Sequence, residues 1–162
     1  MTSPNPRPRR PSVPRRPVLG LPVIAVIGLA LLAAPRIVLH DLGVIHEGTF
    51  VNLLFVIVPP VVWIVVVLRR RVPNPFLTLL VTGLFYGVLL AVGHQVLWDT
   101  ALGDDPPALG GNLGGLDPAA QSVILRLFAA ISSVFTGVIV GAITGLVAWG
   151  LGKAIPSDSR TP

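Results

Sequence analysis

The sequence predicts an all-α membrane protein in which four transmembrane helices form an antiparallel bundle with both termini in the cytoplasm. Hydrophobic residues make up 52% of the 162 residues and charged residues only 12%, whereas roughly a quarter of a soluble domain is charged. The apolar residues gather in four long runs, each long enough to cross a bilayer as a helix. Basic residues lie on one side of these runs and most acidic residues on the other, which predicts the orientation.

Residues 1–17 form a basic segment with six prolines and five arginines. Proline at this density prevents regular helix and sheet, and the segment cannot bury a core. We therefore predict a disordered cytoplasmic tail that lies against anionic lipids of the inner leaflet. A proline-rich peptide that binds a cytoplasmic protein is the alternative interpretation.

The transmembrane domain is predicted over residues 18–152, with spans at residues 18–39, 49–68, 76–98 and 121–151. A short polar tail follows at residues 153–162 and is also predicted to be cytoplasmic. The first span has a basic start like that of a signal peptide. Because its apolar run is long for a signal sequence, we expect it to remain in the membrane.

The second span contains Pro59 and Pro60 at its centre. Because proline has no backbone N–H and clashes with the preceding turn, we predict a kink at this position. We interpret the kink as a static bend, and a transporter hinge is the alternative. Hydroxyl groups on neighbouring helices would complete the hydrogen bonds that the prolines remove, and the candidates are Thr82, Ser133 and Thr136.

Small residues recur along one face of the third and fourth spans. They are Gly83 and Gly87 in the third span and Ser133, Gly137, Gly141 and Gly145 in the fourth. In a bilayer no hydrophobic force draws two helices together, so close backbone approach provides the attraction. We predict that these two spans pack through their small faces, and that Asn74–Pro75 and Asp117–Pro118 begin their helices.

The charge distribution predicts which side of the membrane each loop occupies. Ten of the twelve basic residues, among them Arg69–Arg71, fall on the side that the positive-inside rule assigns to the cytoplasm. Six of the seven acidic residues fall on the other side, most of them in a flexible loop over residues 99–120. We predict a multi-pass protein of the cell (inner or plasma) membrane. Since its basic residues flank the membrane, anionic lipid rather than nucleic acid is the expected partner.

All three histidines fall at the outer ends of spans, close in depth to several carboxylates. The candidates for metal ligands are His40, His46, His94 and Glu47, because imidazole and carboxylate suit zinc or a similar ion. The alternatives are a haem or quinone contact, a path for a small solute or a proton, and a structural polar cap. We expect the cap, which would pair Arg36, Asp41, Asp99 and Arg126, since ionisable groups at membrane depth are costly unless paired.

The sequence has no constellation of catalytic residues, no nucleotide-binding loop and no cysteine. We therefore predict neither an enzyme nor a cofactor. The expected function is that of a non-enzymatic structural or accessory component, which forms a homo-oligomer or joins a larger membrane complex. A transporter or channel subunit for a small solute or protons is the alternative, as is a metal or haem site at the outer face.

Overall fold

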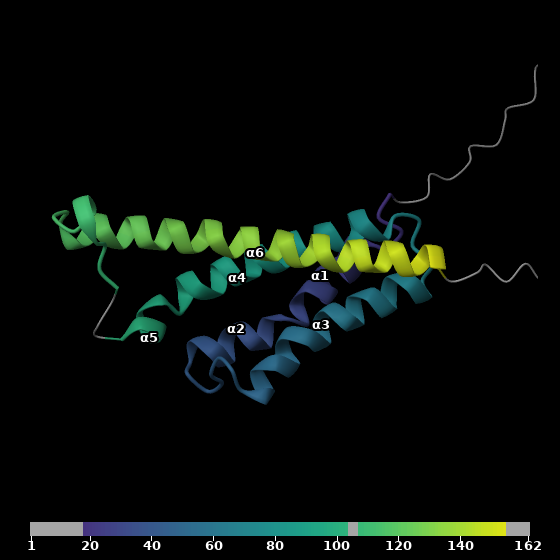
Figure 1. Cartoon of the computed structure of the whole chain (residues 1–162), viewed down its shortest axis with the longest axis horizontal. Helices are drawn as coiled ribbons and strands as arrows, with labels where there is room; N and C mark the ends of the chain where they lie inside the picture. The colour runs from purple at the N-terminus through teal and green to yellow at the C-terminus, as the bar shows by residue number, and fades with distance from the viewer. Residues whose placement is uncertain (1–17, 104–106, 155–162) are drawn as a thin grey trace, which may run out of the picture.

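The structure, a computed structural model, describes residues 18–103 and 107–154 (Figure 1). Its elements are α1 (Val23–Leu31), α2 (Ala34–Asp41), α3 (Phe50–Arg69), α4 (Pro75–Val96), α5 (Trp98–Leu102), the 3-10 helix η1 (Gly111–Leu113) and α6 (Pro118–Ala154). Residues 1–17 and 155–162, which make up the first predicted tail and most of the second, lie outside the described residues.

Four helical segments are long and apolar enough to cross a membrane. They are Val23–Asp41, which α1 and α2 form together, and the helices α3, α4 and α6, and they pack as a bundle. The predicted fold class is thereby confirmed: the chain is an all-α, multi-pass membrane protein with four spans.

The first span is broken where the sequence predicts one continuous helix. α1 ends at Leu31 and α2 begins at Ala34. Pro35, in the first turn of α2, has no N–H to donate to the Leu31 carbonyl, so the α-helical hydrogen-bond pattern stops there. α2 then continues as far as Asp41, which places His40 and Asp41 on a helix rather than in the turn after it.

α3 passes through Pro59 and Pro60 as a single helix. The hydroxyl groups predicted to complete its hydrogen bonds are engaged elsewhere. Thr82 Oγ1 and Ser133 Oγ each donate to the carbonyl four residues earlier in their own helices, at 2.9 and 2.7 Å, and Thr136 is exposed. This part of the prediction is wrong, because a hydroxyl in a helix readily bonds to the carbonyl one turn back.

The predicted starts of α4 and α6 are confirmed by side-chain caps. The Asn74 side-chain oxygen accepts a hydrogen bond from the Leu77 N–H at 3.0 Å, and Asp117 Oδ1 accepts one from the Ala120 N–H at 3.0 Å. Each cap satisfies one of the N–H groups that a helix start leaves without a partner. After α4 the chain forms the short helix α5, where the sequence predicts the beginning of a flexible loop.

α4 and α6 run antiparallel with their backbones in direct contact. A Cβ atom added at Gly83 would overlap the Gly137 carbonyl and lie 2.5 Å from the Gly141 Cα. A Cβ at Gly87 would lie 2.9 Å from the Val134 Cα. These distances leave room for hydrogen only, so glycine is required on both helices. The same face of α6 buries Ser133, Gly137, Gly141, Thr144, Gly145 and Ala148.

α1 and α3 join α4 around Trp63, whose side chain is fully buried. Trp63 Nε1 donates to the Leu29 carbonyl at 2.7 Å, and the ring meets Tyr86 edge-on with centroids 6.0 Å apart. Thr78 Oγ1 of α4 donates to the Leu19 carbonyl at 2.7 Å. These bonds link the helices and satisfy polar groups that have no water within a bilayer.

The helices share one end of the bundle but differ in how far they extend from it. Leu68, near the end of α3, lies beside Gly152, near the end of α6, so Arg69–Arg71 and Lys153 occupy the same end. α6 has 37 residues, which span about 55 Å at 1.5 Å per residue. The turn between α2 and α3 reaches only the middle part of α6, while α5 and the start of α6 project beyond it (Figure 1).

We expect Gly141→Leu to lower the free energy of unfolding by about 2 kcal/mol or more, because the new side chain forces α4 and α6 apart. Gly150→Leu is the matched control on the same helix, since a Cβ there meets nothing within 4 Å. The measurement is thermal unfolding in mild detergent. Equal effects of the two substitutions would contradict the packing described above.

Candidate functional site

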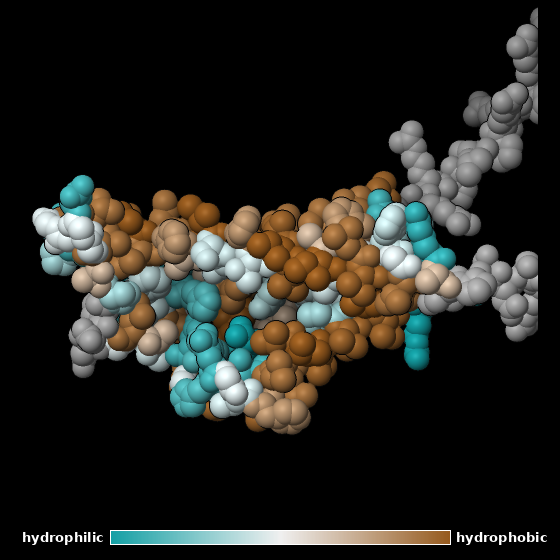
Figure 2. Space-filling model, viewed as in Figure 1, coloured by the Kyte–Doolittle hydropathy of each residue, from teal (hydrophilic) through white to brown (hydrophobic). Residues whose placement is uncertain are grey.

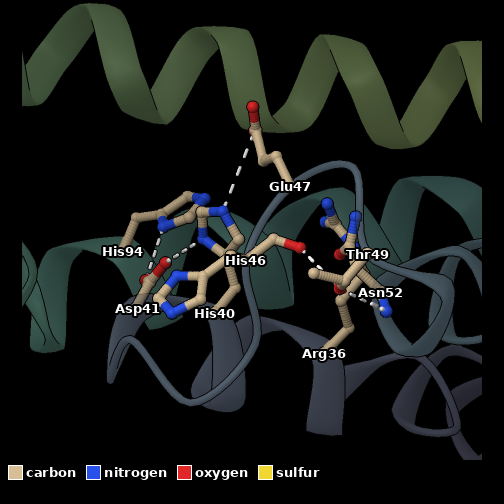
Figure 3. Close-up of polar contacts among 8 residues, drawn as sticks. All are labelled: Arg36, His40, Asp41, His46, Glu47, Thr49, Asn52 and His94. Atoms are coloured by element: carbon tan, nitrogen blue, oxygen red, sulfur yellow. Dashed lines mark hydrogen bonds and ion pairs between the residues drawn. The ribbon is translucent and has the colours of Figure 1, made fainter.

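The polar residues of the bundle converge on Asp41, at the end of α2 (Figure 3). Its side chain is only 3% exposed. Ile37 is buried on the same face of α2, because residues four apart lie one above the other on a helix. That face packs against α4, where Ile37 Cγ2 lies 2.5 Å from the position of a Cβ added at Gly93. The packing of Ile37 therefore carries a carboxylate into the bundle, where it requires polar partners.

Two imidazole rings from different helices contact the Asp41 carboxylate. His94 of α4 places its Nδ1 2.6 Å from Asp41 Oδ2, and His40 of α2 places its Nδ1 3.3 Å from Asp41 Oδ1. The two histidine side chains are 32% and 33% exposed. Both carboxylate oxygens thus have a nitrogen partner, and the contact with His94 joins α2 to α4. A hydrogen bond between an imidazole and a carboxylate also fixes the orientation of the ring.

The turn between α2 and α3 contributes Glu47 and His46. Glu47 Oε1 lies 3.8 Å from His40 Nε2, and its side chain is 83% exposed. His46 is exposed, and its backbone carbonyl accepts a hydrogen bond from Thr49 Oγ1 at 2.7 Å. A chain of close contacts therefore runs from exposed Glu47 through His40 to buried Asp41.

Arg36, one turn before His40, connects α2 to α3. Its Nε donates to the Asn52 side-chain oxygen at 3.0 Å. The partner is an amide, whereas the sequence predicts a carboxylate. Asn52 lies in the first turn of α3, and its N–H donates in turn to Thr49 Oγ1 at 3.3 Å. The guanidinium of Arg36 thereby fixes α3 against the helix that carries Asp41.

A second polar group joins α4, α5 and α6. Arg126 Nη2 donates to Asp99 Oδ1 at 3.1 Å, and the guanidinium carbon lies 4.9 Å from the centroid of the Trp98 ring. Gln95 Nε2 donates to the Arg126 carbonyl at 3.0 Å. Asp99 is 94% exposed, so this ion pair is at the surface, where such pairs add little to stability.

A cavity of about 490 Å³ lies beside the buried carboxylate. Its lining includes His40, Asp41, His94, Trp98, Thr100 and Ala129. The space-filling view shows a hydrophilic patch over the α2–α3 turn, between hydrophobic surfaces on both sides (Figure 2). The imidazoles are therefore reached from the surface of the bundle, while Asp41 lies behind them.

The four predicted metal ligands do not form one coordination group. Within residues 18–103 and 107–154, no three His, Cys, Asp or Glu side chains are arranged to hold a metal ion. His40 and His94 each direct a ring nitrogen at Asp41, and His46 is exposed. The geometry is that of a hydrogen-bonded group of acids and bases, which can bind and exchange protons.

Sequence reasoning placed Asp41, Glu47 and Asp99 at one depth without distinguishing them. The structure buries the first and exposes the other two. The spacing of Asp41 from apolar Ile37 is the signal that could have identified it, since a carboxylate four residues after a buried residue shares its helix face.

Comparison of the chain with protein-family models, with curated proteins and with solved structures finds no match. The contacts and charges of the chain itself are therefore the basis on which its function is inferred.

We expect Asp41→Ala to lower the free energy of unfolding by about 1–3 kcal/mol, because it removes the hydrogen-bond acceptor of His94 Nδ1. Asp99→Ala is the matched control, which removes an exposed carboxylate of a surface ion pair and should lower stability by less than about 1 kcal/mol. Both variants are measured by unfolding in the same detergent. Equal losses would show that burial of Asp41 has no energetic consequence.

Proposed function

We propose that the protein is a non-enzymatic structural or accessory component of a larger membrane assembly, formed with further copies of itself or with another protein. The observation that carries this proposal is the outer end of α6. It extends past the α2–α3 turn (Figure 1) and carries large apolar side chains on its exposed face.

α6 is longer than the bilayer requires. Lys153 Nζ lies 3.9 Å from the centroid of the Trp149 ring, and aromatic and basic residues of this kind are typical of a membrane interface. From Lys153 to Ala129, which lines the cavity beside Asp41, α6 rises about 36 Å, slightly more than the hydrocarbon core of about 30 Å. The first turns of α6, from Pro118 to Ala129, add about 16 Å beyond that level.

These first turns are apolar on the face that no other helix covers. Val123, Leu127 and Phe128 are each more than 60% exposed. Ile131 and Phe135, also more than 60% exposed, continue the same stripe toward the bilayer centre at four-residue spacing. An apolar patch that rises above the hydrocarbon core is typical of a surface that binds protein.

The packing inside the bundle supports a structural role rather than that of a transporter or channel. Trp63 and Leu79 are fully buried, and the contact of Gly83 with Gly137 closes the space between α4 and α6. The buried hydroxyl of Thr82 donates to a carbonyl of its own helix. The packing around Trp63, Leu79 and Gly83 therefore favours a structural role over a polar channel lining in this part of the bundle.

The distribution of charge supports the orientation that we propose. Arg69–Arg71 and Lys153 lie at one end of the bundle, and the described chain also begins and ends there (Figure 1). By the positive-inside rule this end faces the cytoplasm, in the cell (inner or plasma) membrane, with both termini on that side. The arginines there would bind anionic lipids of the inner leaflet rather than nucleic acid.

The orientation is tested by cysteine labelling, for which the cysteine-free chain is well suited. In intact cells a membrane-impermeant maleimide should label Gly115→Cys, in the loop before α6, and should leave Arg70→Cys unlabelled. Permeabilised cells should label both. The reverse pattern in intact cells would invert the proposed topology.

The assembly is tested by photo-crosslinking in native membranes. A photoreactive residue in place of Phe128 should trap a protein, either a second copy or another chain. The same residue in place of Ile143, which is 57% exposed near the bilayer centre, should trap lipid. Capture of lipid alone at both positions would contradict the proposed function.

A further inference from the structure

Asp41 is, among the described residues, the carboxylate whose side chain is buried. Ionisable side chains within a membrane span are costly, and a purely apolar residue would serve the packing of α2 on α4 at no such cost. Its oxygens contact imidazoles on both sides, and histidine is the side chain that changes charge between about pH 5 and about pH 8. Asp41 and the two imidazoles therefore have the chemistry of a proton-binding site.

Access to this group is one-sided. The exposed fraction falls along the contacts from Glu47 (83%) through His40 (33%) to Asp41 (3%). On the inner side, one helical turn away, lie Ile37 of α2 and Leu90 of α4, which are both buried. Protons can enter from the cavity and the α2–α3 turn, while the buried side chains of Ile37 and Leu90 lie on the side toward the opposite end of the bundle.

We propose that His40, Asp41 and His94 form a proton-binding site, open at the end of the bundle opposite Arg69–Arg71, whose occupancy controls the contact between α2 and α4. The site takes up protons from one side of the membrane and does not conduct them. This inference does not depend on the assembly proposed above, since it concerns contacts within one chain.

The direction of the effect depends on the charges that face the site. When both imidazoles are neutral, Asp41 and Glu47 leave two negative charges in the cluster. Uptake of two protons converts the contacts of His40 and His94 into ion pairs and makes the cluster neutral. Because an ion pair between an imidazolium and a carboxylate is stronger than a neutral hydrogen bond, proton uptake strengthens the α2–α4 contact and proton release weakens it.

The other charged and titratable groups near the site are engaged or exposed. Arg36 of α2 bonds to Asn52, exposed His46 lies in the turn, and Arg126 of α6 pairs with Asp99 of α5.

Proton uptake at His94 acts on the contact between α2 and α4. α2 meets α4 through Asp41, His94 and the small area around Ile37 and Gly93. α4 meets α6 through the glycines, whose backbone contact has no titratable group. The pair α4–α6 should therefore stay fixed while the outer end of α2 moves.

The test is a distance measurement by pulsed electron paramagnetic resonance on the full chain in lipid nanodiscs. The spin labels are placed at Leu42→Cys, at the end of α2, and at Thr100→Cys of α5, and both positions line the cavity. Their separation should increase by about 2 Å or more between about pH 5 and about pH 8, the scale of helix shifts in switching proteins. A second pair, Val88→Cys and Phe135→Cys, spans α4 and α6 and should not change.

Three variants in the Leu42/Thr100 background decide the outcome. His94→Gln and Asp41→Asn should each abolish the pH dependence, whereas His46→Gln, which removes an exposed imidazole outside the site, should preserve it. The same three substitutions are also made in the Val88/Phe135 background, where an unchanged distance shows that each variant is folded. A Leu42–Thr100 distance that does not change with pH, or a change that persists in both His94→Gln and Asp41→Asn, would overturn the proposal.

Discussion

The close backbone contact between α4 and α6 is the constraint on which the rest of the structure depends. Lipid surrounds the helices with an environment as apolar as their own side chains, so two helices associate only where their surfaces fit. Gly83 and Gly87 on one helix and Gly137 and Gly141 on the other reduce the separation until backbone meets backbone. The fit also sets the register. It brings the end of α4 that carries His94 and Gln95 beside Arg126 and Ala129 of α6, and it leaves the first turns of α6 extending past the α2–α3 turn (Figure 1).

The first half of the chain is held by a different kind of interaction. Individual hydrogen bonds link the helices from α1 to α4 in this half of the bundle: Trp63 of α3 donates to the Leu29 carbonyl of α1, Thr78 of α4 donates to the Leu19 carbonyl before α1, and Asp41 of α2 contacts His94 of α4. Hydrogen bonds of this kind are directional, and some involve groups that change charge. The bundle therefore combines a pair of helices whose packing is independent of pH with a second set of helices whose outer contact, in our proposal, depends on protonation.

The two features suggest a division of roles within one small protein. The projecting end of α6 offers an apolar surface beyond the level of the Asp41 cluster, suited to contact with another chain. The cavity beside Asp41 is lined by residues of α2, α4, α5 and α6, so it lies between the proposed moving helix and the fixed pair. A change at this site would alter the position of α2 relative to the surface on α6. In these proposals α4 and α6 are the fixed part of the molecule: α2 moves relative to them, and another chain binds the projecting end of α6.

Features that depend on local or periodic patterns could be predicted from the sequence alone. The four apolar runs, the caps at Asn74 and Asp117 and the small faces of α4 and α6 could all be read from composition and from four-residue spacing. The break before Pro35 was not predicted, although its cause is local. The apolar run continues on both sides of Pro35, so its length predicts one continuous helix even though proline has no N–H for the helical hydrogen bond.

The pairing of the polar residues could not be predicted from the sequence, because it depends on how the helices pack. Depth in the membrane is a one-dimensional quantity that the sequence supplies, and it placed three carboxylates and three histidines at one level. Pairing depends on the rotation of each helix about its axis, which is set by the contacts of its apolar face. The packing of Ile37 against Gly93 turned Asp41 toward His94, while Arg36 has an amide as its partner and Glu47, in the turn after α2, is exposed. That rotation results from packing across the bundle, which no single segment of the sequence encodes.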